Sequence, residues 1–545
     1  MKTWQLCTLI AAAALLSFAG LLWDVHGKVL HVAAQGKHLE VVRDEGNQPL
    51  PRGRAFTRAE TNDFLDAAQR AEKIADPLQR CLAYPDPPGS HWDHAVVVAY
   101  CKYRNPPTIT FAQVQQMIQA GHADELDRMF EKALQAQMSD PDARGRLDFT
   151  FFTAFGPDAS FDVRATLDAW KRQSPASAFA YAASGYEYER MAFAARGSDY
   201  ISKTPFSNID SMDRLAQLAD ADLQQAIKLN PKITPVYVTM ISLGAMTLGE
   251  GYALAAAKRG LAQDTANFDI YSKLVWFEQP NWYGSLPAMD GVARDAQKHA
   301  DRNPLLRTLL SERDLYRIDK CKCTPVEELS AYDAVLDHAA MRRTLNDAGY
   351  AAKDAGDAPA MTIYLSEALR FDPTLHDTRI DRIYDLVEFD RIPWAIDEAN
   401  RLIAANPNDE YSLKARGWAY SIGSDAAHAQ QDYEAALKLN PDDGWVQAQL
   451  AGAYMSDQQW DKAWALADRE IEKNPGEVDG WGLRAAIQEQ QPRPGLKDTA
   501  DYLESHFFTD KKNLQFNAYI AHLRTVAQQR DKAKPKGASV ATRPN

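Results

Sequence analysis

This sequence of 545 residues has few cysteines, no excess of basic residues and none of the common active-site motifs. Five cysteines cannot form the dense disulfide framework that holds small secreted domains together. Basic residues number 61 against 74 acidic ones, so the net charge is −13. This balance argues against a nucleic-acid partner, because binding to phosphates needs a positive face. Apolar residues make up 46% of the chain, which is ordinary for a globular protein.

The short motifs that mark common active sites are also missing. The sequence contains no H-E-x-x-H, no G-x-S-x-G, no glycine-rich phosphate loop and no C-x-x-C. We therefore expect no cofactor and no resident metal ion, and a non-catalytic protein is favoured over an enzyme.

A single long apolar run covers residues 4–23, with Lys2 before it and Asp24 after it. Its length suits a helix that crosses a bilayer, and the preceding positive charge would keep the N-terminus in the cytoplasm. For residues 1–27 we predict a single-pass anchor in a bacterial inner membrane, with the bulk of the chain in the periplasm. A small-x-small site ending at Ala19 leaves a cleaved signal peptide and a soluble periplasmic protein as the alternative.

The other four cysteines fit an exported protein. Cys81 and Cys101 flank a segment rich in proline, and a disulfide between them would stabilise the fold by about 3 kcal/mol. We predict this bridge, with two buried thiols as the alternative. Cys321 and Cys323 are only two residues apart. A pair of structural thiols is favoured there over a strained bridge.

The strongest positive signal is a period of 34 residues in the C-terminal third. It is marked by four prolines, each after Asp or Asn: Pro373, Pro407, Pro441 and Pro475. Proline lacks the amide hydrogen and disfavours helix at the preceding residue, so each pair predicts the end of a helix.

Within one such interval, Gly417 and Ala429 let two helices approach closely, and Tyr433 fills the space beside them. This pattern resembles the tetratricopeptide repeat. The units at about 410–443 and 444–477 match well, whereas earlier units are degenerate, with Ile383 at the position of Gly417. The resemblance implies an all-α fold in which a helical N-terminal domain leads into a TPR-type α-solenoid.

A second resemblance covers roughly residues 115–310. The segments at 167–170 and 282–285 are similar to a bacterial domain family of unknown function that often precedes tetratricopeptide repeats, although Tyr283 stands where that family has a glycine. The predicted organisation is an anchor or signal peptide (1–27), a linker with the Cys81/Cys101 region (28–110), a helical domain of unknown function (111–340), the repeats (341–491), capping helices (492–529) and a disordered basic tail (530–545).

The tetratricopeptide resemblance places the first helix of each pair on a concave face, which would form a binding groove. Aromatic side chains give large contact area at low entropic cost, and methionine adapts its shape. The residues expected in this groove are Tyr350, Tyr384, Tyr411, Lys414, Trp418, Trp445 and Met455. The alternative is that these side chains pack against one another or against the N-terminal domain.

These patterns predict a non-catalytic adaptor or scaffold in the cell envelope that binds a protein or peptide partner. The first alternative is an enzyme or small-ligand binder in the N-terminal domain, with the repeats as a docking platform. His91 and His94 could then hold a metal ion with Asp93 or Asp86. The second alternative is an assembly protein that self-associates through its repeats; the sequence does not determine the oligomeric state.

Another candidate for ligand binding combines a charged pair with an aromatic turn. Arg196 and Asp199 could bind an anion, and residues 282–285 could line a pocket. A structural role is favoured for both.

Overall fold

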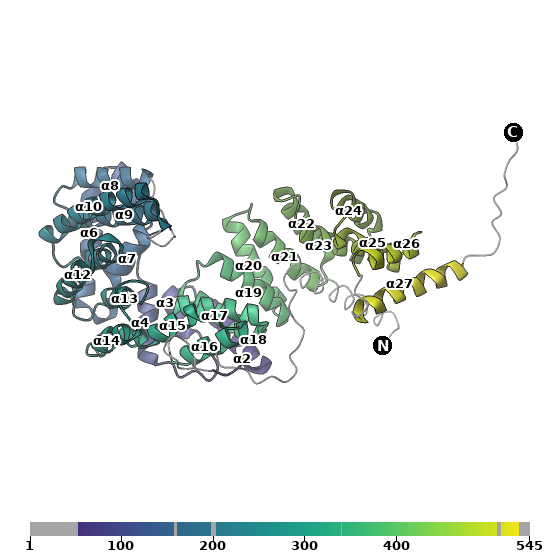
Figure 1. Ribbon diagram of the computed structural model, residues 1–545, viewed down its shortest axis with the longest axis horizontal. Coiled ribbons are helices and arrows are strands. Elements are labelled where there is room, and N and C mark those ends of the chain that lie inside the picture. The colour runs from purple at the N-terminus through teal and green to yellow at the C-terminus, as the bar shows by residue number, and fades with distance from the viewer. Residues whose placement is uncertain (1–52, 157–160, 198–202, 339–340, 509–513, 534–545) are drawn as a thin grey trace. The chain divides into compact units, whose positions relative to one another are not determined.

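The computed structural model describes residues 53–533, except 157–160, 198–202, 339–340 and 509–513 (Figure 1). The regular elements of the described residues are all helices, so the predicted all-α fold is confirmed. The chain forms two compact units, which meet in the sequence between Thr378 and Arg379.

Among the described residues, the first unit contains those from Gly53 to Thr378. Its α-helices are α2 (Arg58–Glu72), α3 (Pro77–Ala83), α4 (His94–Arg104), α5 (Phe111–Gln119), α6 (Ala123–Ser139), α7 (Arg146–Phe155), α8 (Phe161–Gln173), α9 (Ala178–Arg196), α10 (Phe206–Leu229), α11 (Thr234–Leu243), α12 (Glu250–Gln263), α13 (Phe268–Phe277), α14 (Leu286–Gln297), α15 (Glu312–Lys320), α16 (Pro325–Leu336), α17 (Arg342–Ala355) and α18 (Ala358–Phe371). Short helical segments at Pro141–Ala143, Gly244–Leu248 and Pro304–Ser311 connect some of them.

Local sequence explains where several of these helices begin. Helices α2, α5 and α16 each start with a reciprocal capping box. The threonine side chain accepts a hydrogen bond from the backbone N–H three residues later, and the Glu or Gln at that position accepts one from the backbone N–H of the threonine. The pairs are Thr57 with Glu60, Thr110 with Gln113, and Thr324 with Glu327.

Aromatic rings lie together in the hydrophobic core that residues 109–277 form in the first unit. Phe130 of α6 lies between the rings of Phe151, Phe155, Trp170 and Phe179, with centroid distances from 5.6 to 6.3 Å. All five side chains are buried. Edge-to-face and offset pairs of this kind stabilise a core beyond the area that they bury.

The start and the end of the first unit pack against each other. Helices α2, α3 and α4 contact α18, although more than 250 residues separate α4 from α18 (Figure 1). Arg370 of α18 donates to the backbone oxygen of Cys81 and to Asp86, both at 2.8 Å. Arg104 of α4 pairs with Asp372 at 2.7 Å. The first unit is therefore closed by contacts between its two ends.

Two disulfides lie in the first unit. Cys81 and Cys101 are joined, which links α3 to α4. Cys321 and Cys323 are also joined. The sequence favoured separate thiols at this second position, and the structure adopts the alternative.

The second unit consists of helix pairs stacked in chain order. Its helices are α19 (His376–Glu388), α20 (Ile392–Ala405), α21 (Glu410–Ile422), α22 (Ala426–Leu439), α23 (Gly444–Ser456), α24 (Trp460–Lys473), α25 (Val478–Gln490), α26 (Leu496–His506) and α27 (Leu514–Ala533). From α20 to α27 each helix packs against the next one, which is the arrangement of a helical solenoid.

The predicted inner-membrane location is wrong. In the part of the chain that the structure describes, no helix has both the length and the apolar character needed to span a bilayer. Helix α10 is long enough at 24 residues, but aspartate, arginine and lysine occur along it. The predicted anchor or signal at residues 4–23 lies outside the described residues, so neither an anchor nor a periplasmic location is supported.

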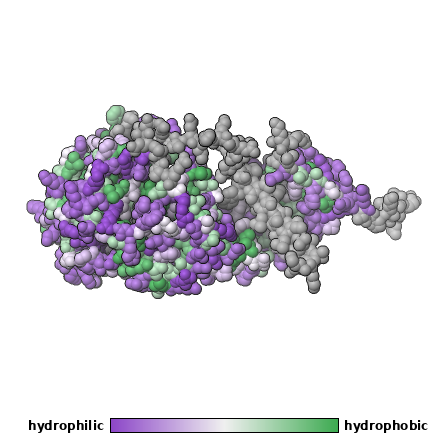
Figure 2. All heavy atoms as spheres, turned by 90° about the horizontal axis from the view of Figure 1, so that it is seen from below, coloured by the Kyte–Doolittle hydropathy of each residue, from purple (hydrophilic) through white to green (hydrophobic). Residues whose placement is uncertain are grey.

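The surface agrees with the charged composition of the chain. On the face drawn in Figure 2, hydrophilic residues predominate among the described residues, and hydrophobic ones are scattered between them. Isolated apolar side chains of this kind are normal on a protein surface.

Candidate partner-binding surface

Close helix packing sets the geometry of the repeats. A β-carbon added to Gly417 of α21 would lie 2.8 Å from the ring of Tyr433 of α22, closer than van der Waals contact allows. Tyr433 is fully buried. The glycine therefore lets the tyrosine ring lie directly on the backbone of the facing helix, as the repeat pattern predicts.

Three aromatic side chains from three successive first helices lie together on the second unit. The ring of Trp445 in α23 is 6.2 Å from that of Trp418 in α21 and 6.5 Å from that of Tyr384 in α19. All three side chains are half-buried. We call Tyr384, Trp418 and Trp445 the aromatic cluster. The 34-residue period relates Tyr384 to Trp418, whereas Trp445 is one period after Tyr411 and so occupies a different position of the repeat.

Lys414 extends the aromatic cluster towards Tyr411. Its ammonium group lies 5.5 Å from the ring of Trp445 and 5.3 Å from that of Tyr411, which is the range of cation–π contact. It also forms ion pairs with Asp443 at 2.5 Å and Glu410 at 3.6 Å. Burial alone would raise the pKa of Asp443, but hydrogen bonds from Lys414 and the backbone of Val446 hold it below its ordinary value.

The remaining predicted groove residues are placed differently. Tyr411 is the most accessible, with 61% of its surface exposed. Met455 is only 3% exposed and packs in the core of the repeats. Tyr350 belongs to α17 in the first unit, where the ammonium group of Lys353 lies 5.9 Å from its ring. The surface that the structure assembles therefore contains Tyr384, Tyr411, Lys414, Trp418 and Trp445.

The metal ligands considered from the sequence do not come together. Asp93 caps α4 and pairs with Arg307, while Asp86 accepts a hydrogen bond from Arg370. His94 is the first residue of α4 and is exposed.

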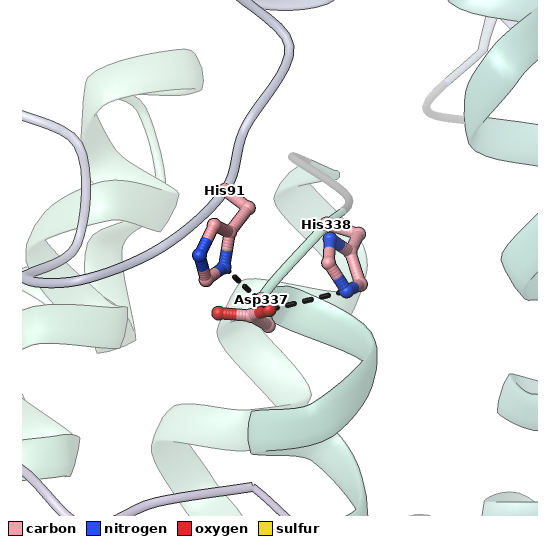
Figure 3. A group of neighbouring side chains, drawn as sticks. All are labelled: His91, Asp337 and His338. Atoms are coloured by element: carbon pink, nitrogen blue, oxygen red, sulfur yellow. Dashed lines mark hydrogen bonds and ion pairs between the residues drawn. The ribbon is translucent and has the colours of Figure 1, made fainter.

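His91 instead lies beside Asp337 and His338, which follow the end of α16 (Figure 3). Sequence reasoning missed both of these residues. They are 246 residues or more from His91 in the sequence, and a pattern of nearby residues cannot predict a contact over that distance.

Arg196 and the aromatic turn at residues 282–285, considered for anion binding, are engaged in aromatic packing instead. Trp282 packs against Trp276 with ring centroids 4.8 Å apart, and the guanidinium group of Arg196 lies 6.0 Å from the Trp282 ring. Tyr283 stacks on Phe277 at 5.3 Å. Asp199 lies outside the described residues.

A cavity of about 510 Å³ lies next to Asp337 and His338 in the first unit. Gly53, Arg54, Pro88, Asp333 and Tyr364 are among the residues that line it. Burial raises the pKa of Asp333 to about 7, although the hydroxyl of Tyr364 donates a hydrogen bond to this carboxylate at 2.6 Å. The cavity therefore holds a carboxyl group that changes protonation near neutral pH.

Comparison with known protein families supports both resemblances found in the sequence. Residues 424–487 match the tetratricopeptide repeat family, and residues 110–254 match a domain of unknown function, DUF4034. The C-terminal part of the chain therefore contains tetratricopeptide repeats, and the first unit contains a DUF4034 domain. No curated protein matches the chain.

Solved structures with some similarity include repeat proteins. The MamA protein is 16% identical over 36% of this chain and 97% of its own, with a TM-score of 0.25. The TPR domain of P58(IPK) is 13% identical over 74% of this chain and 99% of its own, with a TM-score of 0.21. Yeast Tom70 is 12% identical over 78% of this chain and 96% of its own, with a TM-score of 0.31.

Proposed function

We propose that this protein is a non-catalytic interaction scaffold whose repeats bind a segment of a protein partner at the aromatic cluster. The tetratricopeptide repeats support a role in protein interaction. The observation that carries the proposal is that Tyr384, Trp418 and Trp445 converge from three successive helix pairs while each remains partly exposed. Tryptophan and tyrosine dominate the binding energy of many interfaces.

The charges around the aromatic cluster indicate what kind of segment would fit. Lys414 is already neutralised by Asp443 and Glu410, so it does not offer a free positive charge to an acidic partner. Tyr411 adds an exposed ring at the edge of the cluster. An apolar or aromatic anchor residue in the partner is therefore favoured over a strongly acidic motif, because it would gain contact area without breaking these ion pairs.

The test is crosslinking in intact cells followed by capture of the full chain, with wild type compared to the Trp418→Ala/Trp445→Ala variant. We expect a partner captured by wild type to be lost from the variant. Trp464→Ala is the matched control, because Trp464 is a half-buried tryptophan on α24, the second helix of its pair. This control should retain the partner.

Thermal unfolding of each variant separates loss of binding from loss of fold. If the double variant is folded and still captures the same partner, the aromatic cluster is not the binding surface. If Trp464→Ala loses the partner as well, the effect is not specific to the cluster and the assignment also fails.

A further inference from the structure

The first unit contains a group of three side chains with the composition of a transition-metal site. His91 Nδ1 lies 2.8 Å from Asp337 Oδ2, and His338 Nε2 lies 3.1 Å from the same oxygen. Figure 3 shows both imidazole rings turned towards this carboxylate. The three potential ligand atoms all lie within 4.8 Å of one another.

We propose that His91, Asp337 and His338 form a binding site for a divalent transition-metal ion, with Zn²⁺ as the best fit. This site is separate from the repeats and goes beyond the proposed scaffold function.

The spacing of the ligand atoms fits the ion. In a tetrahedral zinc site with bonds of about 2.0–2.1 Å, neighbouring ligand atoms are about 3.3 Å apart. The two distances to Asp337 Oδ2, 2.8 and 3.1 Å, are slightly shorter than this, and the separation of the two imidazole nitrogens is at most 4.8 Å. Binding of an ion therefore requires the carboxylate oxygen to move away from the rings and the two exposed imidazole rings to turn towards each other. Two imidazole nitrogens with one carboxylate oxygen favour zinc and its neighbours over Mg²⁺ or Ca²⁺, which prefer oxygen ligands alone.

The backbone holds the two segments of the site in place. The amide of His91 donates to the carbonyl oxygen of Asp337 at 2.6 Å. The indole of Trp92 donates to the carbonyl oxygen of Leu336 at 2.5 Å. These bonds join the segment before α4 to the end of α16, so the ligands are brought together before an ion arrives.

The site is open to solvent. The side chains of His91 and His338 are 72% and 71% exposed, and that of Asp337 is 34% exposed. An ion can therefore enter without opening the fold, and a water molecule can supply the fourth ligand. Asp337 and His338 also line the cavity of about 510 Å³ described above, so a bound ion would lie at its edge.

The experiment uses the full chain purified without a histidine tag and stripped of metal with a chelator. Zn²⁺ is titrated by calorimetry, Co²⁺ by its absorption spectrum, and Mg²⁺ and Ca²⁺ serve as comparison ions. We expect one Zn²⁺ per chain, a Co²⁺ spectrum typical of nitrogen and oxygen ligands, and no comparable binding of Mg²⁺ or Ca²⁺.

Variants assign the binding to these residues. His91→Ala and His338→Ala should each weaken Zn²⁺ binding at least about tenfold, since even the loss of residues behind the ligands has effects of that size. Asp337→Asn should weaken it as well. The matched control is His94→Ala, which removes a nearby exposed histidine outside the group and should bind like wild type.

Thermal unfolding in chelator shows whether the variants fold, which we expect because both histidines are exposed. The proposal is overturned if wild type does not bind Zn²⁺. It is equally overturned if His91→Ala binds as tightly as wild type, or if His94→Ala weakens binding as much as His91→Ala. In those cases the three residues form only a hydrogen-bonded group.

Discussion

An arginine and an acidic residue pair at the same position in two consecutive repeats. Arg416 donates two hydrogen bonds to Asp432, at 2.6 and 2.8 Å. Arg382 contacts both oxygens of Glu398 at 2.6 Å. In each pair the two residues are 16 positions apart, one on each helix of the repeat. Each acidic side chain is therefore neutralised by an arginine on the facing helix, which offsets the cost of burying its charge.

The next repeat replaces this ion pair with leucines. The positions 34 residues after Arg416 and Asp432 are Leu450 and Leu466, and both are buried in the core of the repeats. The same place between two helices thus accepts either a matched pair of charges or a matched pair of apolar side chains.

This alternation predicts the effect of breaking the pair. Arg416→Leu alone should destabilise the second unit by about 3 kcal/mol, because Asp432 is left with a buried and unmatched charge. This is the lower end of the range for buried pairs, since the Arg416 side chain is 22% exposed. The Arg416→Leu/Asp432→Leu variant, which copies the next repeat, should recover most of that loss. Urea denaturation of both variants measures the difference. A double variant no more stable than the single one would contradict the interpretation.

At the scale of helix pairs, a small side chain on one helix is matched by a large side chain on the facing helix. Gly349 faces Leu365 and Gly417 faces Tyr433, and in each case an added β-carbon would be 2.8 Å or less from the larger side chain. In the repeat between these two, the corresponding residues are Ile383 and Ala399, and both are fully buried. A large residue on the first helix is thus matched by a small one on the second. Ile383 is therefore compatible with the repeat, although its sequence pattern is degenerate.

Gly417→Ala tests this packing. The added methyl group would overlap with the ring of Tyr433, so we expect a loss of about 1–3 kcal/mol in unfolding free energy. Gly452→Ala in α23 is the matched control, because a β-carbon there meets no atom within 4 Å. That change should be neutral or should stabilise the helix by up to about 1 kcal/mol. Equal effects of the two substitutions in urea denaturation would exclude close packing as the cause.

The helices that could be predicted from the sequence are those whose ends are encoded locally. Helices α18, α20, α22 and α24 each end directly before the Asp or Asn that precedes a periodic proline. The shared orientation of Tyr384 and Trp418 followed from the same period, whereas their contacts with Trp445 depend on how successive repeats stack. The burial of Met455 and the pairing of Lys414 with Asp443 did not, because they depend on how neighbouring helices pack. The contact of His91 with Asp337 was even harder to predict from the sequence, because it forms only when the two ends of the first unit pack together.

At the scale of the whole molecule, the two ends of the first unit should open together. Helices α2–α4 pack against α18. Arg370 of α18 donates a hydrogen bond to the backbone oxygen of Cys81, which is 289 residues away in the sequence. Segments with shared buried contacts exchange their amide hydrogens as one cooperative group. We therefore expect α2–α4 and α16–α18 to show similar protection in hydrogen exchange.

Arg370→Ala provides the perturbation for this measurement. It should speed exchange in α2–α4 and in α18, while the repeats from α21 to α24 keep their wild-type rates. Arg128→Ala is the control, because the pair of Arg128 with Asp124 is exposed and contributes little. If exchange rises only in α18, the two ends are not a cooperative group.

The closure of the first unit has a consequence for its synthesis. The backbone oxygen of Cys81 accepts a hydrogen bond from Arg370, and Arg104 pairs with Asp372. Helices α2–α4 therefore emerge from the ribosome long before α18, the helix that completes their packing. At about 5–20 residues per second, the wait is roughly 15–60 seconds. During that time the apolar faces of these first helices have no native cover from α18. The nascent chain is thus exposed to aggregation over this interval, and chaperones that shield apolar segments would act on it then.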